Sequence, residues 1–274
     1  MLTIGSDYKA EIMSVMEAFD AERLVNTYNE HFDVVRASTP SLLDEAYRLR
    51  YQVYCVENPF ENPAEQVDGR ETDIDDDRSV HSLLIHRRTG MTAGTVRVIL
   101  PEPGTQPRPL PIHKVTRSPL LDKIPYHELG EISRFAVSKE FRCRLGESRY
   151  ADIGSANGPS TYANERRVVP YITFGLIRGV LETCLEHQIK YISAVMEPAL
   201  IRLLSRIGLV FEPIGDPVRY HGLRQPCAAR LGDLVEHSRR ERAPVWHYAA
   251  EKAFRPVAPP PRLVEAVTVA GLSD

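Results

Sequence analysis

The feature that most constrains the fold is a strand–helix–strand succession in the second half of the chain. Residues 131–137 (EISRFAV) are predicted to form a strand, residues 170–187 a helix, and residues 191–195 (YISAV) a second strand. When a helix connects two parallel strands of one sheet, the connection is almost always right-handed. We therefore expect these two strands to be parallel neighbours in a sheet that has helices packed against it.

The rest of the chain adds strands and helices around this unit. The segments 82–87 and 94–100 are predicted to form a hairpin, because Arg88-Thr89-Gly90 supplies a turn between them. No break in composition divides the chain, so we predict one α/β domain with a mixed central sheet flanked by helices. We place this domain at residues 31–250, after a helical extension (1–30) and before a Pro-rich tail (251–274). The other predicted elements are strands at 32–37, 210–214 and 228–231, and helices from Thr39-Pro40-Ser41, at 198–207 and from Asp233.

Composition narrows the class of function. The net charge is −3, so the basic excess typical of nucleic-acid-binding domains is absent. No apolar run approaches the roughly 18 residues of a membrane span, and the first residues do not resemble a signal peptide, so we expect a cytoplasmic protein. The four cysteines form no CxxC pair, and HExxH, GxSxG, P-loop and GxGxxG motifs are missing. We therefore expect no metal site, and the usual signatures of hydrolases, NTPases and dinucleotide-binding enzymes are not present.

Two clusters in the first third of the chain are candidates for chemistry. Arg50 and Tyr54 are four residues apart on a predicted helix and should share one face, with Phe60 in the loop that follows. The alternative is a solvated arginine beside a core aromatic residue. The second cluster is acidic and suits a substrate ammonium or an organising arginine, although a plain surface run is the alternative. A loop for a hard metal ion is a further alternative, but the glycine and distal glutamate of an EF-hand are absent. The acidic cluster comprises Glu71, Asp73, Asp75, Asp76 and Asp77.

The third cluster is the strand at residues 131–137. Strand alternation predicts that Glu131, Ser133 and Phe135 face one side of the sheet and that Ile132, Arg134 and Ala136 face the other. Charged residues inside a central strand are seldom buried unless they are paired. The cluster is thus either catalytic or a structural ion pair.

Together these clusters resemble four ordered motifs of the N-acyl-homoserine lactone synthases. The motifs are R-x3-aromatic-x5-aromatic, E-x-D-x2-D, G-x2-R-x3-P and E-x-S-R-F. The stretches RYQVYCVENPFE and GLRQPCAARLGDLV are similar to a sister branch, the acyltransferases of PEP-CTERM/exosortase systems and the related N-acyl amino acid synthases. The matching positions here are Arg50, Tyr54 and Phe60; Glu71, Asp73 and Asp76; Gly94, Arg97 and Pro101; and Glu131, Ser133, Arg134 and Phe135.

This resemblance implies the GNAT fold and transfer of a long-chain fatty acyl group from a thioester to the amine of an amino acid or similar small molecule. Acyl carrier protein or acyl-coenzyme A would be the co-substrate, with no bound cofactor. The thioester would lie where the two parallel strands separate, and Glu131 would remove the ammonium proton through a water molecule. The resemblance implies catalytic roles for Glu131, Ser133 and Arg134; substrate binding by Arg50, Tyr54, Phe60, Asp73, Asp76, Arg97 and Phe135; and donor binding by Val137, Lys139, Arg142 and Arg144.

The donor and the acceptor are less constrained than the reaction. Residues 142–146 (RCRLG) match only part of the R/Q-x2-G-x-G/A signature of coenzyme A users. An acidic carrier protein could instead dock on a basic segment, the alternative being a solvated loop. Two other functions stay open: a homoserine lactone synthase that uses S-adenosylmethionine, and a catalytically silent GNAT-fold module that binds a carrier protein. The basic segment contains Arg142, Arg144, Arg149, Arg166 and Arg167.

Overall fold

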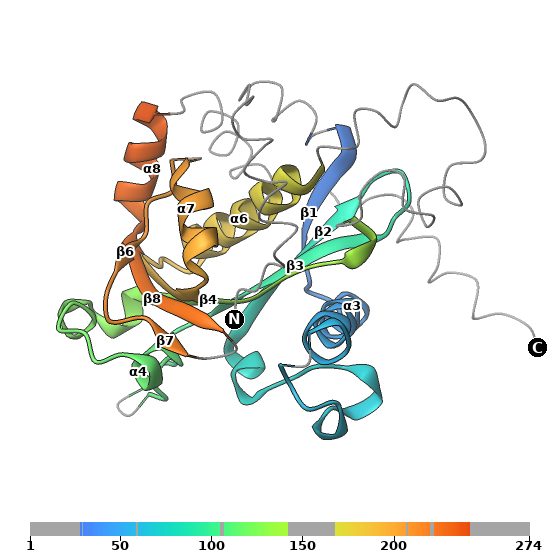
Figure 1. The fold of residues 1–274 in the computed structure, drawn as a ribbon, viewed down its shortest axis with the longest axis horizontal. Coiled ribbons are helices and arrows are strands. Elements are labelled where there is room, and N and C mark those ends of the chain that lie inside the picture. The colour runs from blue at the N-terminus through green and yellow to red at the C-terminus, as the bar shows by residue number, and fades with distance from the viewer. Residues whose placement is uncertain are drawn as a thin grey trace, which may run out of the picture.

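Within the described residues of the computed structural model, eight strands form one mixed sheet (Figure 1). The strand order is β1-β2-β3-β4-β5-β8-β6, and β7 pairs with β8 outside this path. Neighbouring strands are antiparallel, except for β4 and β5, which are parallel as the sequence predicts. The strands are β1 (Phe32–Arg36), β2 (Ser79–His86), β3 (Thr92–Ile99), β4 (Leu129–Val137), β5 (Tyr191–Met196), β6 (Glu212–Pro213), β7 (Val218–Arg219) and β8 (Leu223–Arg230).

The structure describes residues 28, 30–58, 60–104, 107–141, 168–206, 208–219 and 222–241. The predicted Pro-rich tail and nearly all of the predicted N-terminal extension lie outside these ranges. The predicted donor-binding residues Arg142 and Arg144 lie outside them too, as does the rest of the basic segment.

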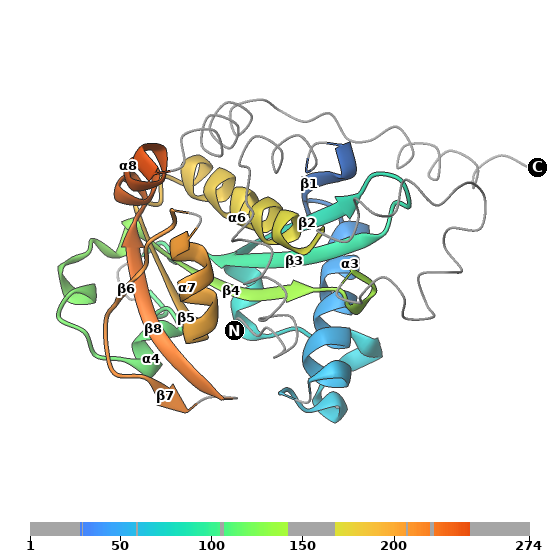
Figure 2. The ribbon, with the colours of Figure 1, turned by 45° about the horizontal axis from the view of Figure 1, so that its top comes forward.

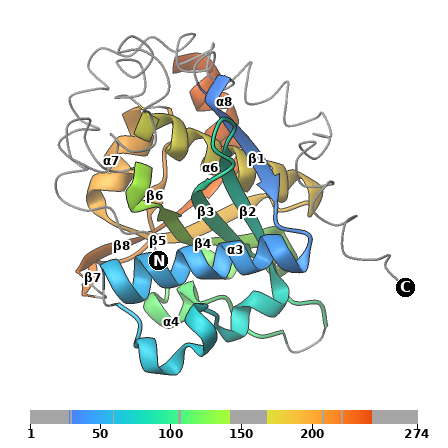
Figure 3. The same ribbon diagram turned by 90° about the vertical axis from the view of Figure 1, so that its right-hand side faces the viewer.

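Helices cover both faces of the sheet (Figure 2). On β2, Leu84 packs in the main core together with α6, whereas its neighbours Leu83 and Ile85 pack with Leu42 and Ala46 at the start of α3. Successive strand residues point to opposite faces, so α6 and α3 lie on opposite sides. Figure 3 shows α3 lying across its face of the sheet. The helices are α3 (Pro40–Tyr51), α4 (Ile112–Val115), α6 (Val168–Glu186), α7 (Pro198–Arg206) and α8 (Leu231–Glu241).

The pairing between β4 and β5 stops early. The two strands are in register from Leu129↔Tyr191 to Ile132↔Ala194, yet β4 continues to Val137. The second half of β4 therefore pairs with β3 but has no ladder partner on β5. This is the strand separation at which the sequence resemblance places the thioester.

Beyond Ser133, the predicted facing of β4 residues is wrong. Ser133 pairs with Arg97 and Ala136 with Thr95, so β4 has two residues where β3 has one, and Arg134 adopts a left-handed backbone conformation with φ of 48°. Such a bulge resets the alternation of a strand. As a result, the Phe135 ring lies in the core under α6, whereas Ala136 packs on the opposite side with Tyr54.

The remaining elements agree with the predictions in type more than in length. The predicted strand 210–214 is reduced to β6, and the predicted strand 228–231 is the end of the much longer β8. The pattern hides β8 because its first residues include Arg224 and Pro226, which are unusual in a central strand. The two-residue β7 was not predicted.

A substitution at Gly175 tests how α6 packs on the sheet. A Cβ atom added there would lie 2.5 Å from Leu84 Cδ1 and 2.7 Å from Tyr28 Cε2. We expect Gly175→Ala to lower the free energy of unfolding by about 1–3 kcal/mol, because the core would be overpacked. Urea denaturation measures this. Gly232→Ala in α8, where the nearest atom is 3.9 Å away, is the control and should not destabilise the protein; equal losses in both variants would contradict this packing.

Candidate active site

Arg50 is the centre of a buried cluster of charges beneath the sheet. Its side chain has no exposed surface. Its Nε donates to Glu71 Oε2 at 2.5 Å, and its Nη1 and Nη2 donate to the two oxygens of Asp76 at 2.6 and 3.1 Å. The alternative of a solvated arginine is therefore wrong, and Arg50 holds two carboxylates of the predicted acidic cluster.

Arg97 approaches the same carboxylates from β3. Its Nη1 donates to Asp73 Oδ1 at 2.6 Å and to Asp76 Oδ1 at 2.7 Å, and its Nε donates to the Ser133 hydroxyl at 2.9 Å. Arg97 and Ser133 are paired residues on adjacent strands, so strand register accounts for their contact. The motif serine thus orients an arginine.

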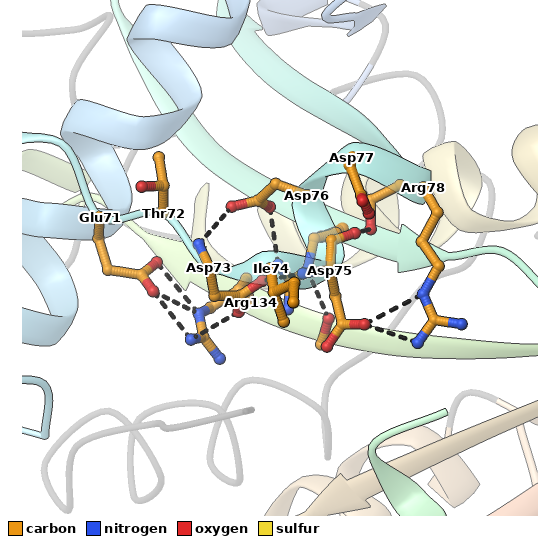
Figure 4. Close-up of polar contacts among 12 residues, drawn as sticks. Glu71, Thr72, Asp73, Ile74, Asp75, Asp76, Asp77, Arg78 and Arg134 are labelled. Carbon is orange, nitrogen blue, oxygen red and sulfur yellow. Dashed lines mark hydrogen bonds and ion pairs between the residues drawn. The ribbon is translucent and has the colours of Figure 1, made fainter. Parts of the chain in front are cut away.

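Arg134 completes the cluster from the bulge of β4 (Figure 4). Its Nε and Nη2 donate to Glu71, and its Nη2 also lies 3.0 Å from Asp73 Oδ2 and 3.3 Å from Glu61 Oε1. The guanidinium carbon lies 5.6 Å from the centre of the Tyr54 ring, a distance suited to a cation–π contact. Glu71 is therefore the principal partner of Arg134, and Asp73 is a second one.

The acidic segment folds so that its carboxylates point at these arginines. Asp73 is the N-cap of the 3₁₀ helix Ile74–Arg78: its side chain accepts from Asp75 N, and its own backbone N–H donates to Asp76. This capping box orients both carboxylates independently of their contacts with the arginines. We refer to Arg50, Arg97 and Arg134, together with Glu71, Asp73 and Asp76, as the arginine–carboxylate network.

The network is balanced in charge, with three guanidinium groups and three carboxylates. Burial alone would raise the carboxyl pKa values, but the Arg97 hydrogen bond and charge lower the pKa of Asp73 to about 2. The pKa values of Glu71 and Asp76 are lowered in the same way, with Arg50 contributing to both. All three carboxylates are therefore charged at neutral pH.

Exposure differs strongly within the network. Glu71 is 1% exposed, whereas Asp73 and Glu61 are each 27% exposed and Arg134 is 12% exposed. Among the described residues, the side chains with the most exposure here are Asp73, Glu61 and Arg134, which we call the reachable edge. Arg134 belongs to the half of β4 that does not pair with β5.

Tyr54 links α3 to the bulge. α3 passes directly into the π-helix Gln52–Glu57, which contains Tyr54, and the Tyr54 hydroxyl donates to the Phe135 carbonyl at 3.0 Å. Phe60 packs against Tyr54 and donates its backbone N–H to the Tyr54 carbonyl. Tyr54 and Phe60 therefore lie beside the network, but the ring of Phe135 lies on the other face of the sheet, in the core.

Glu131 occupies a different environment on the same strand. Its side chain is buried, and its Oε2 accepts from the backbone N–H of Ile112 at 2.8 Å. Burial raises the pKa of Glu131 to about 7, against the opposing effects of the Ile112 N–H and Arg97. Glu131 pairs with Ser193 on β5, one residue before the parallel ladder ends. A carboxyl group with this pKa can exchange a proton near neutral pH.

The predicted site residues do not all lie in one place. The structure brings eight of them together around Glu71: Arg50, Tyr54, Phe60, Asp73, Asp76, Arg97, Ser133 and Arg134. Glu131 is buried on the same strand in a separate environment. The structure places the side chains of Phe135 and Val137 in the core under α6, and Lys139 after the end of β4 in the short helix Lys139–Phe141. The positions of Arg142 and Arg144 are outside the described residues.

Several residues of this region were missed by the sequence analysis. His81 lies 3.3 Å from Asp76, and burial lowers its pKa, so it is neutral at pH 7. Arg224 on β8 forms a buried ion pair with Glu197 at the end of β5, at 3.1 Å. Strand register and burial bring these groups together, and neither is visible in residue spacing.

Neither a candidate metal site nor a candidate membrane-spanning helix occurs in the part of the chain that the structure describes. Across the described ranges, no group of three or more His, Cys, Asp or Glu side chains is arranged to hold a metal ion. In the same part of the chain, no helix combines the length and apolar character needed to cross a membrane.

Comparisons with known proteins identify the fold. Residues 49–150 match a family model described as an acetyltransferase (GNAT) domain. The structure resembles TofI in a ternary complex with an inhibitor and MTA, with a TM-score of 0.50 and 18% identity over 77% of this chain and 95% of that one. No curated protein matches the sequence. The chain therefore has the GNAT fold, as the resemblance implied.

Two further structures are similar to a lower degree. FeeM, an N-acyl amino acid synthase from uncultured soil microbes, has a TM-score of 0.46 and 17% identity over 76% of this chain and 94% of that one. BjaI, a CoA-dependent acyl-homoserine lactone synthase, has a TM-score of 0.45 and 18% identity over 83% of this chain and 90% of that one.

Arg48 and Arg50 provide a matched test of the network. We expect Arg50→Gln to lower the free energy of unfolding by about 3–5 kcal/mol, because Glu71 and Asp76 would keep their buried charges without their main partner. Arg48→Gln, two residues away on the same helix and 54% exposed, should leave the urea midpoint almost unchanged. Similar midpoints for the two variants would show that the network does not stabilise the fold.

Glu131→Gln should change the pH dependence of stability. Folding raises the pKa of Glu131. Its contribution to the free energy of unfolding is therefore fully present below pH about 4.5 and is lost as the pH rises through about 7. We therefore expect Glu131→Gln to match the wild type in urea at pH 4.5 and to exceed it at pH 8, by on the order of 1–3 kcal/mol. The exposed Glu65→Gln is the control and should show no such pH-dependent difference. A Glu131→Gln variant less stable than the wild type at pH 8 would argue against a raised pKa.

Proposed function

We propose that this GNAT-fold chain is an N-acyltransferase that moves a fatty acyl group from a thioester to the amine of an amino acid or a related small molecule. The observation that carries the proposal is the position of Glu131. It is a buried carboxyl group with a pKa of about 7, one residue before β4 and β5 stop pairing. A base is needed at that point, because an amine attacks a thioester only after losing its ammonium proton.

The reaction follows from this arrangement in two bond changes. The neutral amine nitrogen forms a bond to the thioester carbonyl carbon, and the C–S bond then breaks. The nitrogen loses a further proton in this step and the leaving sulfur gains one, so that the products are the amide and the thiol. Glu131, through a water molecule, accepts the proton that the ammonium group loses. Backbone N–H groups of β4 near residues 135–137 would stabilise the oxyanion, since that half of the strand has no ladder partner on β5. No covalent enzyme intermediate is required.

The arginine–carboxylate network would bind the acceptor. Its reachable edge presents the carboxylates of Asp73 and Glu61 together with the Arg134 guanidinium. A molecule with both an ammonium and a carboxylate group meets opposite charges there. An amino acid has both groups, which is why it is the preferred acceptor class.

The donor is the less determined substrate. The partial pyrophosphate-binding signature at residues 142–146 favours an acyl carrier protein over acetyl-coenzyme A, and the basic segment would meet the acidic surface of such a carrier. An association with PEP-CTERM/exosortase systems stays part of the proposal on the strength of the sequence resemblance. A cytoplasmic location would suit both the donor and the reaction.

A homoserine lactone synthase that uses S-adenosylmethionine is the second candidate. The motif residues that carry that resemblance are also present in the network, so the site geometry does not separate the two reactions. A catalytically silent binding module is disfavoured, because it would not need a titratable carboxyl group at the strand separation.

Lipid extracts test the proposal directly. We expect a bacterial host that overproduces the protein to accumulate a series of N-acyl amino acids, detected by mass spectrometry, and the same host with Glu131→Gln to accumulate none. In purified form, Glu131→Gln should lower kcat by about 10²–10⁴ with little change in the acceptor KM, because only the base is removed. Accumulation of lactones would support the second candidate. A Glu131→Gln enzyme with wild-type turnover would remove the proposed base.

A further inference from the structure

The 3₁₀ helix Ile74–Arg78 makes separate polar contacts at its two ends. At its start, Asp73 and Asp76 belong to the arginine–carboxylate network. At its end, Asp75 and Arg78 form a separate pair, in which Nε and Nη2 of Arg78 donate to Asp75 Oδ1 at 3.0 and 2.6 Å (Figure 4). The Arg78 side chain is 7% exposed, so this is a largely buried arginine that the network does not use.

Arg78 also reaches a different segment of the chain. Its Nη1 donates to the Arg108 carbonyl at 2.7 Å, and its Nη2 donates to the Pro109 carbonyl at 3.0 Å. The Tyr126 hydroxyl donates to the same Arg108 carbonyl at 2.5 Å and lies 3.3 Å from Arg78 Nη1. The Arg78 guanidinium therefore joins the 3₁₀ helix Ile74–Arg78, the acidic helix, to the carbonyls of two consecutive residues just before α4.

Regular backbone hydrogen bonds, like those between paired strands, cannot hold residues 107–111 in place. Residues 107, 109 and 111 are prolines, so three of the five backbone nitrogens of this segment carry no hydrogen. Leu110 and Ile112 anchor it by burying their side chains with Ile99 and Leu129. The backbone N–H of Ile112 then donates to Glu131 Oε2 at 2.8 Å. The position of this N–H depends on how the preceding carbonyls are held.

We propose that Arg78 is a positioning residue for Glu131: by holding the carbonyls of Arg108 and Pro109, it keeps the Ile112 N–H on the Glu131 carboxylate. Arg78 itself does not touch Glu131 and would act through residues 107–112. An effect of Arg78 on catalysis rests on the proposed function, but the contacts of Arg78 with the Arg108 and Pro109 carbonyls do not.

The direction of the effect follows from the groups around Glu131. The Ile112 N–H and Arg97 of β3 favour the charged form, whereas Asp75 of the acidic helix opposes it. Ser193, the paired residue on β5, is neutral. Loss of Arg78 would loosen the Ile112 N–H and would also remove the cation that neutralises Asp75. Both changes disfavour the charged carboxylate, so the Glu131 pKa should rise.

The experiment is an NMR titration of the wild type and of Arg78→Gln, each with ¹³C-labelled glutamate carboxyl groups. The signal of Glu131 is assigned from its loss in Glu131→Gln. We expect the Glu131 midpoint to rise by about one pH unit in Arg78→Gln, and kcat/KM at pH 6 to fall about tenfold while recovering toward the wild-type value at pH 9. Arg87→Gln, which removes an exposed arginine paired with Asp33, is the control and should leave the titration unchanged.

An unchanged Glu131 midpoint in folded Arg78→Gln would overturn the proposal, as would a loss of activity that is equal at all pH values. If Arg78→Gln does not fold, Tyr126→Phe removes one donor to the Arg108 carbonyl without removing charge, and it should raise the midpoint in the same direction by a smaller amount; no shift in that variant would overturn the proposal equally. Failure of the proposed function is separate, because the titration needs no turnover: a wild-type protein without acyltransferase activity can still show the shift.

Discussion

Three arginines buried under a sheet impose the main constraint on this structure. Arg50, Arg97 and Arg134 come from α3, β3 and β4, and they meet on carboxylates from one short acidic segment. A buried guanidinium that loses its partner is strongly destabilising, so these three elements and the segment must keep fixed relative positions. Such a network adds little net stability over apolar packing, but it allows a polar site to lie against a sheet that is otherwise apolar.

The site divides charges between two environments on one strand. Within the arginine–carboxylate network, low pKa values keep Asp73 and its neighbours charged, so they can bind but cannot accept protons near neutral pH. Glu131, two residues before Ser133, is buried and accepts one backbone N–H, and its burial raises its pKa to about 7. The difference in pKa between Glu131 and the carboxylates of the network therefore results from where each side chain lies, since all of these groups are carboxyl groups.

Much of this arrangement could be predicted from the sequence, because periodicity and motif spacing identify the elements and the residues that matter. The parallel β4–β5 pair is confirmed, and Arg134 lies 3.0 Å from Asp73 of the predicted acidic cluster. The bulge could not be predicted, because the alternation of residue types along a strand does not show where one extra residue is inserted. The predicted side of the sheet for Phe135 was therefore wrong. Arg78 and His81 were also missed, since their importance arises from contacts across 30 residues or within a buried space that spacing does not reveal.

The contact between Tyr54 and Phe135 has a consequence for changes in the length of the chain. A π-helix accommodates one residue more than an α-helix over the same length, and a strand bulge also accommodates one residue more than its partner strand. These two irregular turns meet at the hydrogen bond from the Tyr54 hydroxyl to the Phe135 carbonyl. Each resembles a single-residue insertion, and each would misplace the contact without the other. A change of length in either element would therefore displace this hydrogen bond, which ties the end of a helix to the interior of a strand 81 residues later in the chain.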